Sequence, residues 1–305
     1  MVVCIIGTTL FIHLTTMFCI LVPWLWPLRT LLSKLSFLVL NASTSLLLIN
    51  YYLCIVSNPG TVYSYYQPPP ETALELTPVM DYLEVDPATD VLSPHYCHSC
   101  QRYKPPRAHH CRYCSRCILR MDHHCSWIAN CVGHGNQAHF IRFLFWSCIS
   151  CWCCVLVIVA RLEVVLVGAV RGHSNLEMES GELIIVCMNV VVLTPMVTMV
   201  SMLFYNQIQL LLTNETTIEN LKKNRYSSYS YAGRRVDLNE NPYDLGNWFE
   251  NVQQVLGENP LFWLLPNFQF HSKPSWSGVS GDEEVWHRDG HWFPIGTHVQ
   301  RILHE

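Results

Sequence analysis

The chain has 305 residues, and half of them are hydrophobic, whereas only 14% are charged. Soluble domains carry about 25% charged residues, so this composition indicates that lipid replaces water over much of the surface. The net charge of −4 argues against a nucleic-acid partner, because proteins that bind polyanions carry a basic excess.

Four uncharged apolar runs predict membrane spans, because a helix needs about 20 apolar residues to cross the hydrocarbon core. The runs cover residues 2–22, 35–56, 143–160 and 183–212. Four such runs in one chain favour spans over buried core helices. The first run lacks the basic segment and small-residue cleavage site of a signal peptide, so we interpret it as a retained anchor.

The basic residues predict the orientation of these spans. Cytosolic loops carry an excess of Lys and Arg. The connection between the second and third runs has six in a short stretch, and three follow the fourth run, whereas the loop from Arg171 to Glu182 has only one, Arg171. We therefore expect both termini, and the segment between spans two and three, to lie in the cytosol.

The segments outside the spans differ in composition. Residues 57–94 are rich in Pro, Tyr and acidic residues and read as a cytosolic lead-in. Residues 95–140, called here the Cys/His module, have too little apolar material for a conventional core. The cytosolic tail, 213–305, contains TTIE at 216–219 and NPYDLG at 241–246. Within 241–257 the apolar residues recur at helical spacing, which predicts a short amphipathic helix.

These observations predict an all-α polytopic membrane protein. Four transmembrane helices are expected, with a cytosolic, zinc-stapled Cys/His-rich module between helices 2 and 3. No internal repeat of solenoid period is visible. The expected domains are 1–56 for spans one and two, 57–94 for the lead-in, 95–140 for the Cys/His module, 141–212 for spans three and four, and 213–305 for the tail.

The Cys/His module has the residues of a zinc protein. Seven of the fifteen cysteines lie between Cys97 and Cys131. Two C-x2-C pairs with further Cys and His nearby are typical of tetrahedral zinc. Metal binding would also supply the folding free energy that the small core cannot. The redox interpretation of C-x-x-C requires a thioredoxin-like context, which is absent.

The number of candidate ligands exceeds what two four-ligand sites require. At least one thiol can therefore stay free, and the nine candidates are Cys97, Cys100, Cys111, Cys114, Cys117, Cys125, Cys131, His110 and His124. Cys125 is the natural choice because it follows Asp122 and His123. A neighbouring imidazole can take the thiol proton, and a carboxylate can hold that imidazole in one tautomer. The alternative is that Cys125 is an incidental thiol or a substitute ligand.

At these residues the chain resembles the DHHC-type protein S-acyltransferases, the membrane palmitoyltransferases. The matching pattern is Cys-x2-Cys-x9-His-Cys-x2-Cys-x2-Cys-x4-Asp-His-His-Cys-x5-Cys, followed by Asn136 and Phe140. Weaker matches to the family pattern are NPG at 58–60, TTIE at 216–219 and the pair Asn241 and Tyr243. The sequence departs from the family at Ser126, where Pro is usual, and at Asn58, where Asp is usual.

The resemblance implies roles for individual residues. Cys125 would be the acylated nucleophile, His123 the base and Asp122 its orienting partner, with Thr216, Thr217 and Glu219 in support. Two structural zinc ions would be bound, one by Cys97, Cys100, His110 and Cys117, and the other by Cys111, Cys114, His124 and Cys131.

The implied activity is two-step thioester exchange. A long-chain acyl group, such as palmitoyl, would pass from acyl-CoA to Cys125 and then to a cysteine of a membrane-associated substrate protein; no residue is assigned to CoA binding. The stretch NCVGHGNQAHFIRFLFW resembles the fungal endoplasmic-reticulum branch, which favours that membrane, with the Golgi as the alternative. Two rival functions are a non-catalytic zinc-stabilised membrane adaptor or ligase scaffold, and a thiol-disulfide oxidoreductase.

Overall fold

The computed structural model describes residues 1–22, 31–62, 95–171, 178–223, 229–231, 234–236, 241, 243–266 and 293. Most of the predicted lead-in, from 63 to 94, and the remaining parts of the tail lie outside the described residues. The chain divides into two compact units. One consists of Met1–Tyr52 and Ile141–Asn206, and the other of Leu53–Phe140 and Gln207–Glu305.

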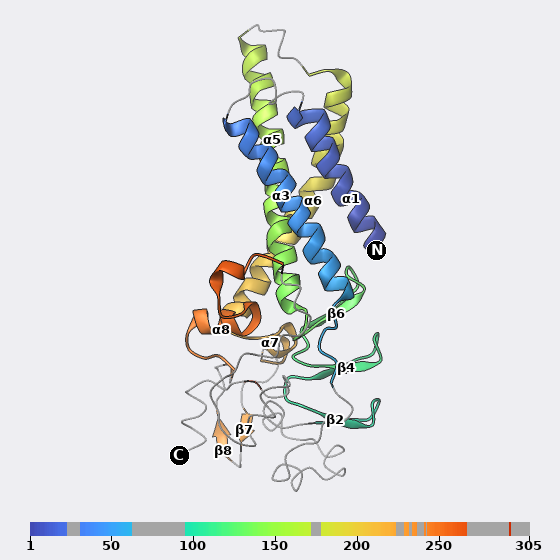
Figure 1. The fold of residues 1–305 in the computed structure, drawn as a ribbon, viewed down its shortest axis with the longest axis vertical. Helices are drawn as coiled ribbons and strands as arrows, with labels where there is room; N and C mark the ends of the chain where they lie inside the picture. Colours follow the sequence, from blue (N-terminus) through green and yellow to red (C-terminus); the bar gives the residue numbers. More distant parts are fainter. Residues whose placement is uncertain are drawn as a thin grey trace. The chain divides into compact units, whose positions relative to one another are not determined.

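Four long helices run alongside one another in the first unit (Figure 1). They are α1 (Val2–Thr15), which continues as the π-helix η1 (Thr16–Leu21), α3 (Leu31–Val56), α5 (Gln137–Val170) and α6 (Ser180–Leu212). All four are long and apolar enough to cross a membrane. The prediction of four spans is therefore confirmed, and the chain is an integral membrane protein with four candidate spans.

The third span is longer than its uncharged run. The uncharged run ends at residue 160, and the sequence left open whether Arg161 marks the end of the span or a paired charge within it; α5 continues to Val170. The guanidinium of Arg161 is buried and pairs with both carboxylate oxygens of Glu182, with Nε–Oε1 and Nη2–Oε2 distances of 2.6 and 2.9 Å. Pairing of opposite charges is the usual way in which such residues are accommodated inside a span.

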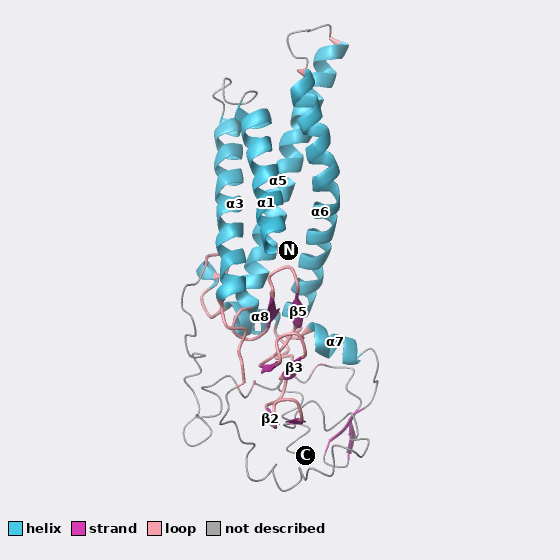
Figure 2. Ribbon diagram, turned by 90° about the vertical axis from the view of Figure 1, so that its right-hand side faces the viewer, coloured by secondary structure: helices cyan, strands magenta, loops and turns pink. Residues whose placement is uncertain are grey.

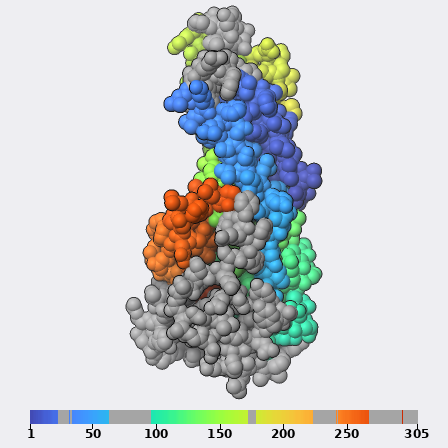
Figure 3. Space-filling view, in the orientation of Figure 1, coloured from blue at the N-terminus to red at the C-terminus, as the bar shows by residue number. Residues whose placement is uncertain are grey.

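Packing within the first unit combines an apolar core with polar links between helices. Thr15 donates to the Asn189 side-chain oxygen at 2.9 Å, and the hydroxyls of Thr44 and Ser150 lie 2.9 Å apart. The space-filling view shows α1 and α3 packed side by side (Figure 3, blue). The apolar core around them includes Ile12, Ile20, Leu40, Cys154, Ile158 and Leu193.

The Cys/His module folds as three small antiparallel hairpins within the second unit (Figure 2). Hairpins this short are marginally stable on their own, so the module needs further cross-links. The pairs are β1 (His95–Cys97) with β2 (Arg102–Lys104), β3 (His109–Cys111) with β4 (Arg116–Ile118), and β5 (His123–Cys125) with β6 (Asn130–Val132).

The Asn130 side chain and the NPG turn connect this module to the end of α3. The Asn130 amide donates to the carbonyl oxygens of Ser57 and Cys54 at 2.9 and 3.1 Å, which satisfies acceptors that a helix end leaves free. In the NPG turn, the Asn58 side-chain oxygen accepts from the N–H groups of Gly60 and Thr61 at 3.0 Å. An aspartate oxygen would accept the same bonds, so Asn58 preserves the turn that the resemblance implies.

The tail contributes short elements to the second unit. They are α7 (Thr217–Lys223), β7 (Tyr229–Tyr231) paired with β8 (Arg234–Val236), α8 (Trp248–Leu256) and the 3-10 turn η5 (Pro260–Phe262). α8 lies within the range predicted as an amphipathic helix. The Asn251 amide ties it to the Leu212 carbonyl oxygen at 2.7 Å. The surface of α8 and η5 is continuous (Figure 3, orange to red).

Candidate metal centres and reactive thiol

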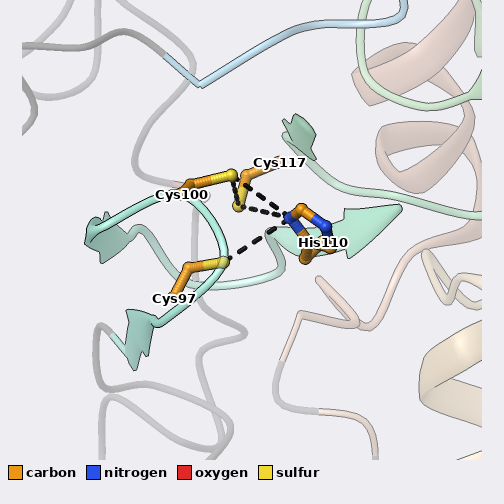
Figure 4. A group of neighbouring side chains, drawn as sticks. All are labelled: Cys97, Cys100, His110 and Cys117. Atoms are coloured by element: carbon orange, nitrogen blue, oxygen red, sulfur yellow. Dashed lines mark hydrogen bonds between the residues drawn. The ribbon is translucent and has the colours of Figure 1, made fainter. Parts of the chain in front are cut away.

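The first metal-binding group joins two hairpins. Cys97 and Cys100 come from the first hairpin, and His110 and Cys117 come from the second. Their sulfur atoms and the imidazole converge on one point (Figure 4). The Nδ1 atom of His110 lies 3.5, 3.2 and 3.8 Å from the sulfurs of Cys97, Cys100 and Cys117. Four soft ligand atoms therefore surround a space of the size of one metal ion.

The second group repeats this arrangement one hairpin further along the chain. It consists of Cys111, Cys114, His124 and Cys131. The Nδ1 atom of His124 lies 3.6, 3.4 and 3.5 Å from the three sulfurs. The ring of Tyr113 stacks on His124, with 4.8 Å between the ring centroids. The two groups contain the same residues as the two ligand sets that the family resemblance implies.

The chemistry of the sulfurs suits a bound cation. Burial and the adjacent Cys97 and Cys100 raise the pKa of the Cys117 thiol, and burial with the adjacent Cys111 and Cys114 raises that of Cys131. Three thiolates cannot share so small a volume unless a positive ion balances their charge. Both groups could therefore hold a metal ion that binds thiolate sulfur and imidazole nitrogen.

Cys125 belongs to neither group. Seven cysteines lie between residues 97 and 131, all of them described, and the two groups contain the other six. Cys125 is the last residue of β5, and its side chain interacts with His123, two residues earlier. The Nδ1 atom of His123 lies 2.6 Å from an oxygen of Asp122. The Cys125 thiol thus contacts the His123 imidazole, which in turn contacts the Asp122 carboxylate.

The electrostatics of these three groups favour charge separation. Burial alone would lower the pKa of His123, but hydrogen bonds with Asp122 and Cys125 raise it to about 9. Burial would raise the pKa of Cys125, yet the hydrogen bonds from His123 and from the Ile128 N–H lower it below the ordinary value. An imidazolium beside Cys125 therefore favours the thiolate over what burial alone would allow, and the thiolate is the nucleophilic form of cysteine.

Asp122 is held by more than its imidazole partner. The N–H and hydroxyl of Thr217 donate to its two oxygens at 2.7 and 2.9 Å, and the Gln207 amide donates at 3.2 Å. Although burial raises the pKa of Asp122, the bonds from His123 and Thr217 lower it overall, so the carboxylate is ionised. The expected support from the TTIE motif therefore has a structural basis in Thr217. Sequence reasoning missed Gln207, since it stands outside every motif.

A second buried network fixes the start of α7. The guanidinium of Arg107 donates to both oxygens of Glu219 at 2.7 and 2.8 Å and to the Asn214 carbonyl at 2.7 Å. Its carbon lies 4.2 Å from the ring centroid of Tyr243. The Asn214 side chain in turn accepts from Arg120 at 2.6 Å. This network links the Cys/His module to the TTIE and NPYDLG segments.

Comparison with known proteins agrees with this geometry. The model of the family described as DHHC palmitoyltransferase matches residues 91–224. The probable protein S-acyltransferase 16 of Arabidopsis thaliana is 34% identical over 219 residues, which cover 71% of each chain. The chain belongs to the DHHC palmitoyltransferase family. Asp122, His123, His124 and Cys125 form the tetrapeptide that gives the family its name.

Other members of the DHHC family align over different shares of their length. The palmitoyltransferase PFA4 of Mycosarcoma maydis is 40% identical over 228 residues, which make up 71% of this chain and 46% of the relative. The palmitoyltransferase ZDHHC6 of Mus musculus is 28% identical over 284 residues, 87% of this chain and 60% of the relative. The chain thus spans about half the length of the Mycosarcoma protein.

Proposed function

We propose that this protein is a protein S-palmitoyltransferase that carries the acyl group on Cys125. The observation that carries the proposal is the separation of Cys125 from both metal-binding groups, together with its contact with the His123–Asp122 pair. Membership of the DHHC palmitoyltransferase family supports the same reaction. A non-catalytic adaptor would have no use for a thiol whose pKa is lowered in this way.

The first half-reaction transfers the acyl group to the enzyme. The Cys125 thiolate attacks the carbonyl carbon of a long-chain acyl-CoA, and a thioester forms as the bond to the CoA sulfur breaks. His123 gives its proton to the departing CoA thiolate and becomes neutral. Asp122 holds the ring through Nδ1, so the other ring nitrogen is the one that exchanges the proton.

The second half-reaction reverses these roles. Neutral His123 takes the proton from the cysteine of a substrate protein, and the new thiolate attacks the acyl carbon on Cys125. The Cys125 thiolate is released beside an imidazolium, as at the start. One thioester replaces another at each step, so no nucleotide hydrolysis is needed. Membrane-associated proteins are the expected acceptors, because their cysteines are confined to the same surface.

We propose zinc for both metal-binding groups. In a tetrahedral site with Zn–S bonds of about 2.3 Å, the sulfur–sulfur edges measure about 3.8 Å and the sulfur–nitrogen edges about 3.6 Å. The Cys100–Cys117 and Cys114–Cys131 sulfur pairs are 3.6 and 3.5 Å apart, close to those edges. Three thiolates and one imidazole fill such a site, so zinc would stabilise the fold and leave no position for a reacting water.

The test is acyl transfer to the purified full chain from labelled palmitoyl-CoA. We expect a hydroxylamine-sensitive label that is absent from Cys125→Ser, while the metal content of the variant equals that of the wild type. Cys148→Ser, which changes a thiol of α5, is the matched control and should label normally. Equal labelling of Cys125→Ser and the wild type would contradict the assignment, and a reversible Cys-Cys oxidation without label would favour an oxidoreductase.

We also propose the endoplasmic-reticulum membrane as the location, with the Cys/His module and both termini in the cytosol. The asymmetric distribution of Lys and Arg supports the orientation. The resemblance of residues 130–146 to the fungal endoplasmic-reticulum branch supports the organelle. Microscopy of a tagged chain against endoplasmic-reticulum and Golgi markers tests the organelle, and protease protection of each terminus in sealed microsomes tests the orientation.

A further inference from the structure

The three hairpins of the Cys/His module are copies of one unit of 14 residues. They start at His95, His109 and His123, and in each the first strand residue pairs with the residue nine positions later. The last residue of each turn, Gln101, Ser115 or Ala129, has a positive φ of 54°, 52° or 51°. Aligned by this register, the units read HYCHSCQRYKPPRA, HHCRYCSRCILRMD and HHCSWIANCVGHGN.

The metal ligands occupy fixed positions of this unit. Each group takes the third and sixth residues of one hairpin, for example Cys97 and Cys100. It takes the second and ninth residues of the following hairpin, here His110 and Cys117. Among the described residues no hairpin precedes the first one, and its second and ninth residues are Tyr96 and Tyr103, whose rings pack edge to face with 5.2 Å between centroids.

The third hairpin has no successor, and its third and sixth residues are Cys125 and Ile128. Cys125 therefore stands where the other two hairpins place a metal ligand. The turn around it also keeps the features of a metal-binding turn. The Cys114 N–H donates to the Cys111 sulfur at 3.4 Å, and the N–H groups of Trp127 and Ile128 donate to Cys125. The one ligand position that has changed within this turn is residue 128, whose side chain is fully buried.

We infer that the third hairpin is a metal-binding turn that has lost its second sulfur, and that Ile128 keeps Cys125 free of metal. Zinc sites in proteins take three or four protein ligands. With isoleucine at position 128, Cys125 and the adjacent His123 supply at most two. A cysteine at the same position would supply the third. The inference rests on the proposed metal sites and on the proposed role of Cys125. It identifies Ile128 as the residue that distinguishes the reactive hairpin from the two metal-binding hairpins.

Metal counting in Ile128→Cys tests this inference on the purified full chain. We expect about three zinc ions per chain in this variant and about two in the wild type, because each complete ligand set binds one ion. The second change Cys125→Ser, added to Ile128→Cys, should return the count to the wild-type value. The acyl label on Cys125 should fall further in Ile128→Cys than in Ile128→Ser, since the bound ion would occupy the thiolate.

Two matched variants separate the new sulfur from other effects. Ile128→Ser removes the same hydrocarbon without adding a thiol, and Trp127→Cys adds a thiol one residue away at an exposed position. Both should keep the wild-type metal count. A wild-type count in Ile128→Cys, with labelling equal to that of Ile128→Ser, would overturn the inference. A third ion in Ile128→Ser would overturn it as well, because loss of bulk would then suffice.

A measurement on the wild type decides the question even if substitutions at residue 128 prevent folding. With Ile128 in place, a molar excess of zinc should leave the rate of thioester formation on Cys125 unchanged. Inhibition by one added ion per chain would show that the single thiol holds metal, and the inference would be wrong. Failure of the proposed function has a different signature, namely a wild-type chain that contains no metal or takes no label.

Discussion

Asp122→Asn isolates the contribution of one charge to acyl transfer. The carboxylate accepts four hydrogen bonds, from His123 Nδ1 at 2.6 Å, from the N–H and hydroxyl of Thr217 at 2.7 and 2.9 Å, and from Gln207 at 3.2 Å. Every one of these partners donates. An asparagine must therefore aim its NH2 group at a donor, whichever way the amide is turned.

The size of the effect follows from this count. Losing one hydrogen bond to a charged group inside a protein costs about 3 kcal/mol at the upper end of the usual range. Each 1.36 kcal/mol changes a rate tenfold, so transfer should slow by about 100-fold from this loss alone. Loss of the charge that stabilises the His123 imidazolium slows the reaction further. The corresponding Asp→Asn change in a Ser-His-Asp triad lowers kcat by about 10⁴-fold. We expect a reduction between these two values.

Single-turnover thioester formation on Cys125 is the appropriate assay, with metal content as the criterion of folding. Gln207→Leu serves as the graded control, because it removes only the longest of the four bonds to Asp122. Its rate should fall by less than about tenfold, the equivalent of a single weak hydrogen bond. If Asp122→Asn retained its metal ions and transferred acyl groups within about threefold of the wild type, the proposed orienting role of Asp122 would be wrong.

Three further substitutions test other contacts. In His123→Ala the pKa of Cys125 should rise, because burial then acts without the imidazolium, and the pH profile of iodoacetamide alkylation should move to higher pH; an unmoved profile would remove His123 from the thiolate pair. The double substitution Cys111→Ser with Cys114→Ser leaves two ligands in the second group, too few for a zinc site, so it should lower the metal content from about two ions to about one and make the chain sensitive to protease; full metal content would contradict the second site. Arg107→Lys keeps the charge but cannot pair with both oxygens of Glu219, so thermal unfolding should show a loss of at least about 2 kcal/mol, whereas an unchanged midpoint would show that the paired geometry is unimportant.

The uncharged apolar runs predicted the four helices, because crossing a bilayer requires such runs and little else. The same rule could not fix the end of α5. Arg161 ends an uncharged run, yet its partner Glu182 lies 21 residues further along the chain, on the next helix. No periodicity in the sequence shows that two charges so far apart will pair.

Part of the candidate site could also be predicted from the sequence, for a different reason. Cysteines and histidines are identified by their chemistry, so counting them was enough to show that one thiol exceeds two tetrahedral sites. Counting did not show which residues share an ion. The hairpin register supplies that, and its 14-residue period is short enough to escape a search for solenoid repeats. Gln207 lies 85 residues from Asp122, and only the fold brings them together.

Ser126 replaces the proline that the family resemblance leads us to expect, and the structure predicts that the proline would be tolerated. Residue 126 is exposed and opens the turn after Cys125. The N–H groups that donate to the thiol belong to Trp127 and Ile128, so a residue without an N–H at 126 removes neither bond. The φ of Ser126 is not positive, and proline requires a negative φ.

We therefore expect Ser126→Pro to form the thioester at a rate close to that of the wild type. It should also raise the free energy of unfolding by about 0.4–1 kcal/mol, because proline restricts the unfolded chain. The measurements are single-turnover labelling and thermal unfolding, with Ser126→Ala as the control that removes only the hydroxyl. If both variants slowed transfer more than tenfold, the Ser126 hydroxyl would take part in the reaction. If only the proline variant did so, the backbone of the third hairpin would have to move during transfer, and the thiol would not be held by a preformed turn.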